Sequence, residues 1–261
     1  MHELSPGWQT DLAIFQLEGS SVEEFEDHLI VRSPHNPTFH WGNCLVVTDA
    51  TAADDAPRWM AAFGAAHPSA DWIAVGFTQM PTVTQAWTAA GVELELDDVL
   101  STRTPPRAVP CPDGYSVRRI FGDDWERLIV RNLAENERSG EHEPRRHEQF
   151  VRRRAASHRT LCDRGLAAFF GAFCGADLVA DLGIVRCGET ARYQNVETEP
   201  AHQRRGLASH LLGVAATWAR NGGCDRWVIV TEATNAAGRV YRSVGFEPDV
   251  PTARAYRRPP V

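Results

Sequence analysis

Residues 196–212, VETEPAHQRRGLASHLL, pass from a β-type segment through Gln-Arg-Arg-Gly directly into an amphipathic helical pattern. The first N–H groups of a helix lack backbone partners, and the helix dipole adds partial positive charge at that end. Gly206 has no Cβ to keep an anion away from the backbone, and Arg204 and Arg205 add two full charges. The stretch therefore predicts a site for a phosphate or pyrophosphate. An ordinary helix start with two exposed arginines is the alternative.

The surrounding residues predict an α/β domain. Amphipathic periods with capping residues mark the helices, whereas apolar or alternating segments between short turns mark the strands. The expected helices are 123–137, 143–161, 207–222 and 235–245. The expected strands are 115–120, 165–173, 177–185, 191–198 and 225–231. The turns CGAD and CGET predict an antiparallel meander of the strands that they join.

The first part of the chain holds a fainter β-α-β-α-β pattern. Its expected segments are 38–47, 56–67, 71–77, 82–92 and 93–102. A linker with four prolines, residues 101–114, follows, so we place the domains at 1–108 and 109–261. The repeated order suggests a duplicated architecture. Because this first pattern lacks early strands, apolar residues such as Trp41, Leu45 and Trp72 are expected to need a cover.

A second motif, NAAGRVYRSVGF at 235–246, follows about 30 residues after QRRGLA. The two motifs together resemble the GCN5-related N-acetyltransferase (GNAT) superfamily, in which a Gln/Arg-x-x-Gly-x-Gly/Ala loop precedes such a helix. Asn235, Tyr241, Gly245 and Phe246 match, whereas Gly238 stands where the family often has Ala. The resemblance covers residues 113–261. It implies a GNAT fold with a mixed sheet, and a first lobe that is a degenerate GNAT-like copy.

The resemblance implies acetyl-CoA as the acyl donor. Backbone groups at 196–198 would hold the acetyl and pantetheine arm, amides at 204–209 would hold the pyrophosphate, and Asn235 would bond the pantetheine. The implied cofactor residues are Val196, Glu197, Thr198, Gln203, Arg204, Arg205, Gly206, Leu207, Ala208, Ser209, Asn235 and Tyr241. In the first lobe the corresponding loop, residues 48–57, has aspartates and no glycine. An acidic loop repels pyrophosphate, so the first lobe is not expected to bind CoA.

Two residues are candidates for the chemistry of acyl transfer. Tyr241 would donate a proton to the departing thiolate, because a phenol pKa of about 10 lies near that of a thiol. Its alternative is a packing aromatic. Glu197, close to the expected thioester, is the candidate base, and a solvated strand carboxylate is the alternative. A backbone N–H at 196–198 would stabilise the oxyanion.

Composition excludes several other classes. The ten His and six Cys show no metal-ligand spacing, and no run is long enough to span a bilayer, so we expect no metal and no membrane. The N-terminus lacks a signal-peptide pattern, which favours a cytoplasmic protein. Residues 1–104 hold 3 Arg and 15 acidic residues, whereas 105–261 hold 24 Arg and 19 acidic residues. This asymmetry predicts two lobes that associate within a monomer.

We therefore expect an acetyl-CoA-dependent N-acetyltransferase that acts on the primary amine of a small molecule, either a simple amine or an amino-acid-like one. A non-catalytic acyl-CoA-binding module and an aminoacyl-tRNA-dependent transferase are alternatives. The intact Tyr241 disfavours the first, and the intact phosphate loop disfavours the second. Arginines at 145–146 and 152–154 allow binding of RNA or another anion, but a solvated helix face explains them better.

Overall fold

The computed structural model describes residues 4–233 and 235–259, which form two compact units. The first unit comprises residues up to Val99 together with Val250–Val261, and the second comprises Leu100–Asp249. This division differs from the expected one at residue 108. The linker signal of four prolines lies inside the second unit, because residues 100–114 pack with it, and the last strand of the chain returns to the first unit.

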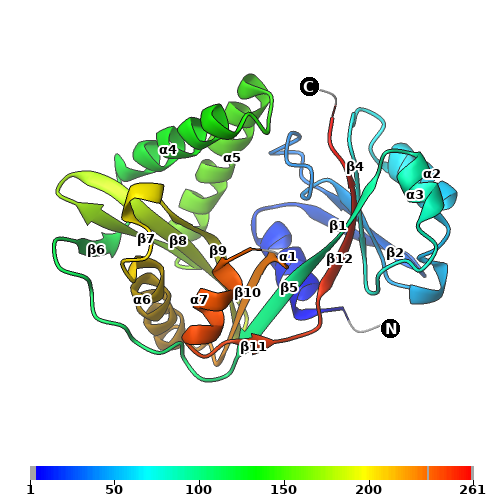
Figure 1. Cartoon of the computed structure of the whole chain (residues 1–261). Coiled ribbons are helices and arrows are strands. Elements are labelled where there is room, and N and C mark those ends of the chain that lie inside the picture. Colours follow the sequence, from blue (N-terminus) through cyan, green and yellow to red (C-terminus); the bar gives the residue numbers. More distant parts are fainter. Residues whose placement is uncertain (1–3, 234, 260–261) are drawn as a thin grey trace. The chain divides into compact units, whose positions relative to one another are not determined.

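The second unit carries neighbouring strands of a mixed sheet, in the order β10-β9-β8-β7-β6 (Figure 1). Its strands are β6 (Ser116–Arg119), β7 (Ala167–Cys174), β8 (Asp177–Cys187), β9 (Thr190–Thr198) and β10 (Arg226–Glu232). Strands β6 to β9 are antiparallel neighbours, which confirms the predicted meander, and β10 is parallel to β9. The helices are α4 (Asp124–Ser139), α5 (Pro144–Asp163), α6 (Leu207–Asn221) and α7 (Ala237–Ser243).

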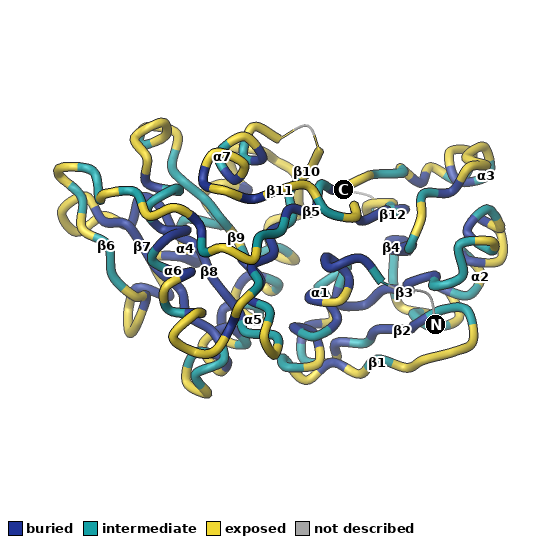
Figure 2. Tube along the Cα trace, turned by 90° about the horizontal axis from the view of Figure 1, so that it is seen from below, coloured by how far each residue is buried: buried dark blue, intermediate teal, exposed yellow. Residues whose placement is uncertain are grey.

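Helices cover both faces of this sheet. Trp125 of α4 and His158 of α5 contact the ring of Phe169 on one face of β7, with centroids 5.2 and 4.5 Å away. A Cβ at Gly183, the β8 partner of Phe169, would meet that same ring. Leu211 and its apolar neighbours on α6 pack against the other face (Figure 1). The unit thus has three layers, and buried residues follow β7 and β8 (Figure 2).

The first unit also has a sheet between helices. Its strands are β1 (Ser21–Glu24), β2 (His28–Arg32), β3 (Cys44–Val47), β4 (Ile73–Phe77), β12 (Thr252–Arg257) and β5 (Glu93–Thr102), in that order across the sheet. Its helices are α1 (Pro6–Leu17), α2 (Ala56–Ala66) and α3 (Gln85–Ala89). The expected β-α-β-α-β order is present as β3-α2-β4-α3-β5, in which β3 and β4 are shorter than the sequence indicated and β5 has the expected bounds.

The expectation that the first lobe lacks early strands is wrong. An antiparallel β1–β2 hairpin precedes β3, and α1 packs its Trp8 against the sheet. The β1 sequence SVEE is mostly exposed and weakly apolar, so its period-2 signal is faint. The unit therefore covers its own apolar surface, including Leu45 and Trp72.

Strand β5 runs across the boundary between the two units, and its two ends pair with different strands. Residues 93–97 pair with β12 in the first unit, whereas Leu100 and Ser101 pair with β11 (Glu247–Pro248) in the second. In the first unit, β12 lies between β4 and β5 and pairs with both. Each unit is thus completed by a segment from a distant part of the sequence.

Candidate functional site

The paired strands β9 and β10 separate part of the way along their length. Their parallel ladder ends at Arg192 and Val228, although β9 continues to Thr198 and β10 to Glu232. On its other side β9 has one extra residue, because Gly183 faces Gln194 and Asp181 faces Glu197. Such a bulge bends a strand. The β10-facing backbone edge of residues 196–198 is therefore left outside the ladder.

The loop after β9 leads into α6 with an open helix end. A short 3₁₀ turn (Pro200–His202) follows β9, and the Gln203 side chain donates to the Thr198 carbonyl at 3.1 Å. Gly206 is the N-cap residue with φ of 85°, a conformation that favours glycine, and no side chain caps the helix within the described chain. Arg204 also has a positive φ, of 59°.

The first turn of α6 is anchored in the core, although its end is exposed. Leu207 is buried, and the ring of His210 lies 2.6 Å from the Val109 carbonyl. Arg204, Arg205 and Gly206 are exposed, and Ala208 and Ser209 are partly exposed. Apart from the buried Leu207, the predicted residues 203–209 therefore form one exposed or partly exposed, positively charged surface around uncapped N–H groups. This surface can accept an anion without any change of the helix.

Helix α7 places Asn235 and Tyr241 in different surroundings. The Asn235 side-chain oxygen accepts the N–H of Ala237, the first residue of α7, at 2.9 Å, and Ala236 is the N-cap residue of the helix. Tyr241 is buried beside Phe246. Burial raises the pKa of Tyr241 to about 12, and the charge of Arg192 on β9 opposes that rise. The phenol is therefore protonated at neutral pH.

Glu197 belongs to a cluster of charges that the motifs did not indicate. Its carboxylate accepts from Nη2 of Arg131, on α4, at 3.1 Å, and Arg131 also forms a close ion pair with buried Asp181. Val196, next in the chain, is half-buried against the core. Nothing in the sequence distinguishes Arg131 from the other arginines as a partner of Glu197. Asp181 could have been noticed, because it is an acidic residue inside an otherwise apolar strand segment.

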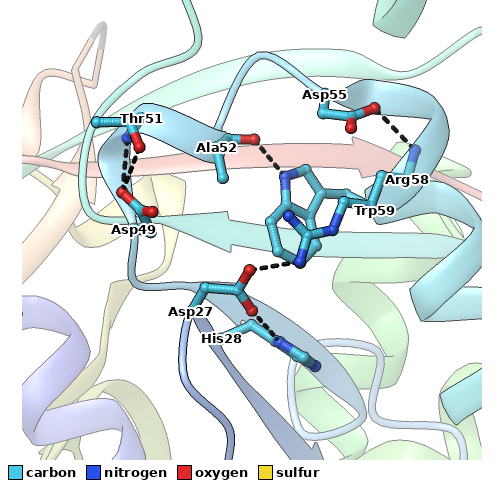
Figure 3. A network of polar contacts seen from close by, with 8 residues as sticks. All are labelled: Asp27, His28, Asp49, Thr51, Ala52, Asp55, Arg58 and Trp59. Atoms are coloured by element: carbon cyan, nitrogen blue, oxygen red, sulfur yellow. Dashed lines mark hydrogen bonds and ion pairs between the residues drawn. The ribbon is translucent and has the colours of Figure 1, made fainter.

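The corresponding loop of the first unit is occupied by its own side chains (Figure 3). The Asp55 carboxylate accepts the Arg58 N–H at 3.2 Å and caps α2, and Asp49 accepts the Thr51 N–H at 2.9 Å. Asp27 binds both Arg58 and His28, and the hydrogen bond from His28, followed by that from Arg58, lowers the pKa of Asp27. Asp55 therefore takes an N–H group at the start of α2 that an external anion would need.

The described residues hold neither a metal-binding cluster nor a membrane-spanning helix. No group of three or more His, Cys, Asp or Glu residues there is arranged to hold a metal ion. Within residues 4–233 and 235–259, no helix is both long and apolar enough to cross a membrane.

Comparison with known proteins gives a family. The model of the acetyltransferase (GNAT) family matches residues 119–246. A search of curated protein sequences finds no match. Among solved structures, a GCN5-related N-acetyltransferase from Kribbella flavida has a TM-score of 0.63 and 15% identity, with 97% of this chain and 96% of that chain covered.

Two further structures cover both units. A functionally unknown conserved protein from Staphylococcus epidermidis has a TM-score of 0.69 and 10% identity, over 93% of this chain and 95% of that one. A tandem GNAT protein from the clavulanic acid biosynthesis pathway has a TM-score of 0.56 and 14% identity, over 95% and 88%. At these identities the likeness establishes the fold alone. It confirms the predicted α/β fold with two GNAT-like lobes.

Proposed function

This chain belongs to the acetyltransferase (GNAT) family, and we propose that it transfers an acetyl group from acetyl-CoA to the primary amine of a small molecule. The observation that carries this proposal is the uncapped N-terminus of α6 beside the open edge of β9. Family membership supports acyl transfer in general, and the site geometry supports CoA as the carrier.

The pyrophosphate of acetyl-CoA would bind residues 204–209. Helix N–H groups and the α6 dipole favour a dianionic group there, and Arg204 and Arg205 add charge from exposed positions. Gln203, through its bond to Thr198, ties this loop to the end of β9. The left-handed backbone conformation of Arg204 is strained for a residue other than glycine. Strained residues cluster at ligand-binding sites, so this conformation supports a binding role for the loop.

The pantetheine arm would run along residues 196–198. Those backbone groups lie outside the β9–β10 ladder, so an extended ligand can pair with them as an added strand does. Asn235 uses its side-chain oxygen on Ala237, which leaves its NH₂ group as the donor for the ligand. One N–H of this segment would stabilise the oxyanion of the tetrahedral intermediate.

Tyr241 would return a proton to the departing thiolate. With the pKa of Tyr241 at about 12 and that of a thiol at about 8.5, this transfer is uphill by about 5 kcal/mol, more than the sequence suggested. Two features reduce the difference. The Arg192 charge stabilises the phenolate, and burial beside Tyr241 would raise the pKa of the thiol as well. Glu197 remains the candidate to receive the proton of the amine.

The proposal extends to the location, the oligomeric state and the ligands of the protein. The protein would act as a cytoplasmic monomer with one acetyl-CoA, no metal and no nucleic acid, and its first unit would bind no CoA. The ion pairs of Arg152 with Glu126 and Glu148 support a solvated role for the basic helix α5.

The deciding experiment combines calorimetry with acetyl-CoA and a thiol-release assay over a panel of primary amines. We expect one binding site per chain and release that depends on the amine. Binding without release for every amine would favour the alternative, a non-catalytic acyl-CoA-binding module. No binding at all would overturn the CoA site.

A further inference from the structure

A buried ion pair holds the side chain of Glu197. Arg131 lies between the carboxylates of Asp181 and Glu197, in contact with both. The side chain of Asp181 is 1% exposed, that of Arg131 is 9% and that of Glu197 is 42%. Asp181 and Arg131 are therefore the interior of the cluster, and Glu197 is the member that a ligand can reach.

The sheet register explains this arrangement. Asp181 and Glu197 are directly opposite partners on β8 and β9, where two like charges destabilise a sheet. The guanidinium of Arg131 offsets that repulsion from α4. Because a buried charge without its partner is very costly, Arg131 is committed to Asp181. Glu197 is thereby attached to a rigid part of the fold.

The charge balance indicates what would bind there. One guanidinium and two carboxylates leave a single net negative charge, and of the two carboxylate side chains only that of Glu197 is exposed. Glu197 lies in the segment of β9 that runs beyond its last pairing with β10. An ammonium group is attracted to this position, whereas a carboxylate is repelled.

Resting on the proposed function, we infer that Glu197 receives the acceptor as an ammonium ion and that Arg131 and Asp181 are positioning residues for Glu197. The acceptor is then a primary amine without a carboxylate on the carbon that bears the nitrogen. The ammonium releases one proton through Glu197 to solvent. The neutral nitrogen forms the new N–C bond with the thioester carbonyl, the C–S bond breaks, and the thiolate gains the second proton that nitrogen loses.

The test compares acceptors that differ by that carboxylate: tyramine with tyrosine, histamine with histidine, and ethylamine with alanine. We expect kcat/KM to favour the amine of the most active pair by at least tenfold. Glu197→Gln, which keeps size and removes charge, should raise the KM of the amine about tenfold and shrink that preference. The acetyl-CoA affinity, measured by calorimetry, should stay unchanged. Glu126→Gln, another exposed carboxylate paired with an arginine, is the matched control and should change neither value.

The positioning role has its own variants. Arg131→Met combined with Asp181→Asn removes the inner pair without leaving a buried charge unpaired. We expect a higher KM for the amine and a lower kcat at unchanged acetyl-CoA affinity, with partial rescue in Arg131→Lys. Lower thermal stability with unchanged kinetics would show the pair to be structural and overturn its positioning role.

The outcomes separate this inference from the proposed function. If acetyl-CoA binds and amines are acetylated, but amino acids react as well as their matched amines, only this inference is overturned. If acetyl-CoA does not bind, or no amine releases thiol, the proposed function fails and this inference fails with it.

Discussion

The starts of α2 and α6 form a comparison within one chain. Each helix follows a strand in a β-α-β order, but α2 begins with Asp55, whose carboxylate accepts a helix N–H, whereas α6 begins with Gly206 and no side-chain cap. A capped helix has satisfied its own polar groups, and an uncapped exposed one offers them to a ligand. The difference teaches that two helix starts at matching places in the fold can differ in whether a side chain satisfies their N–H groups, and that the N-cap residue decides this.

The strand pairs beside these helices also differ in how far their hydrogen-bonded ladders extend. The β3–β4 ladder runs to Val47 and Phe77, and Thr78 continues it with a bond to the Val47 carbonyl at 3.2 Å. The β9–β10 ladder stops at Arg192 while β9 goes on. In the first unit Trp8 also lies against Gly76 of β4, where a Cβ would collide with its ring. The first unit is thus closed at both places where the second is open.

The largest effect should come from cutting the chain at the proline-rich linker. A fragment of residues 109–261 lacks the end of β5 that pairs with β11, and it leaves β12 without β4 and β5. We expect it to be insoluble or self-associated by light scattering, with the full chain monomeric. A monomeric, fully active fragment would show that the shared strands are dispensable.

Gly206→Glu should abolish most acetyl-CoA binding. The change forces a side chain into a left-handed conformation and puts negative charge at the α6 N-terminus, so we expect at least about 100-fold weaker binding by calorimetry. Gly223→Glu makes the same change at a left-handed position beyond the other end of α6 and should leave affinity intact. Equal losses in the two variants would show that the effect is on folding.

Tyr241→Phe should reduce turnover about 100-fold with little change in acetyl-CoA affinity. Tyr193→Phe is the matched control, because this buried hydroxyl donates to the Leu212 carbonyl at 2.8 Å. Its loss should cost about 1 kcal/mol of unfolding free energy and leave turnover unchanged. Wild-type turnover in Tyr241→Phe would make Tyr241 a packing residue.

The alkaline pH dependence follows from burial in both units. The pKa of Tyr241 in the second unit and of Tyr256 in the first is raised by burial to about 12. A raised folded-state pKa contributes stability below the unfolded value of about 10, and this contribution is lost as pH rises from about 10 to 12. Urea unfolding at pH 9, 10 and 11 should show a decline that Tyr241→Phe makes shallower. A decline of equal slope in the variant would contradict the assignment.

The smallest effect should come from opening the capped helix. Asp55→Ala removes the cap of α2 and should cost about 1 kcal/mol of unfolding free energy, measured by urea titration. Acetyl-CoA stoichiometry should stay at one per chain, because the β3–β4 ladder and Trp8 still close the unit. A second acetyl-CoA site in this variant would show that the Asp55 cap alone prevents the first unit from binding acetyl-CoA.

Local signals account for most of what could be predicted. The meander and the helices α4 to α7 follow from short-range patterns in glycine and apolar spacing, and the structure shows them close to the expected residues. The phosphate-binding role of residues 203–209 stays a prediction. Strand β1 gives no usable period because its four residues are weakly apolar, whereas residues 29–31 of β2 are an apolar strand signal that the prediction left out. The cluster around Glu197 was missed because Arg131 and Asp181 are 50 residues apart in the sequence and meet only across α4 and β8.

The sequence by itself determined the family, the open loop at Gly206 and the acidic character of its counterpart, because these depend on which residues stand next to one another. Only the tertiary structure decided which segments complete each sheet, and that Glu197 is held by Arg131. It also showed that Tyr241 is a weaker acid than a free phenol. The physical reason is that the pairing of distant strands, buried ion pairs and desolvation depend on contacts between residues far apart in the sequence, which no local pattern records.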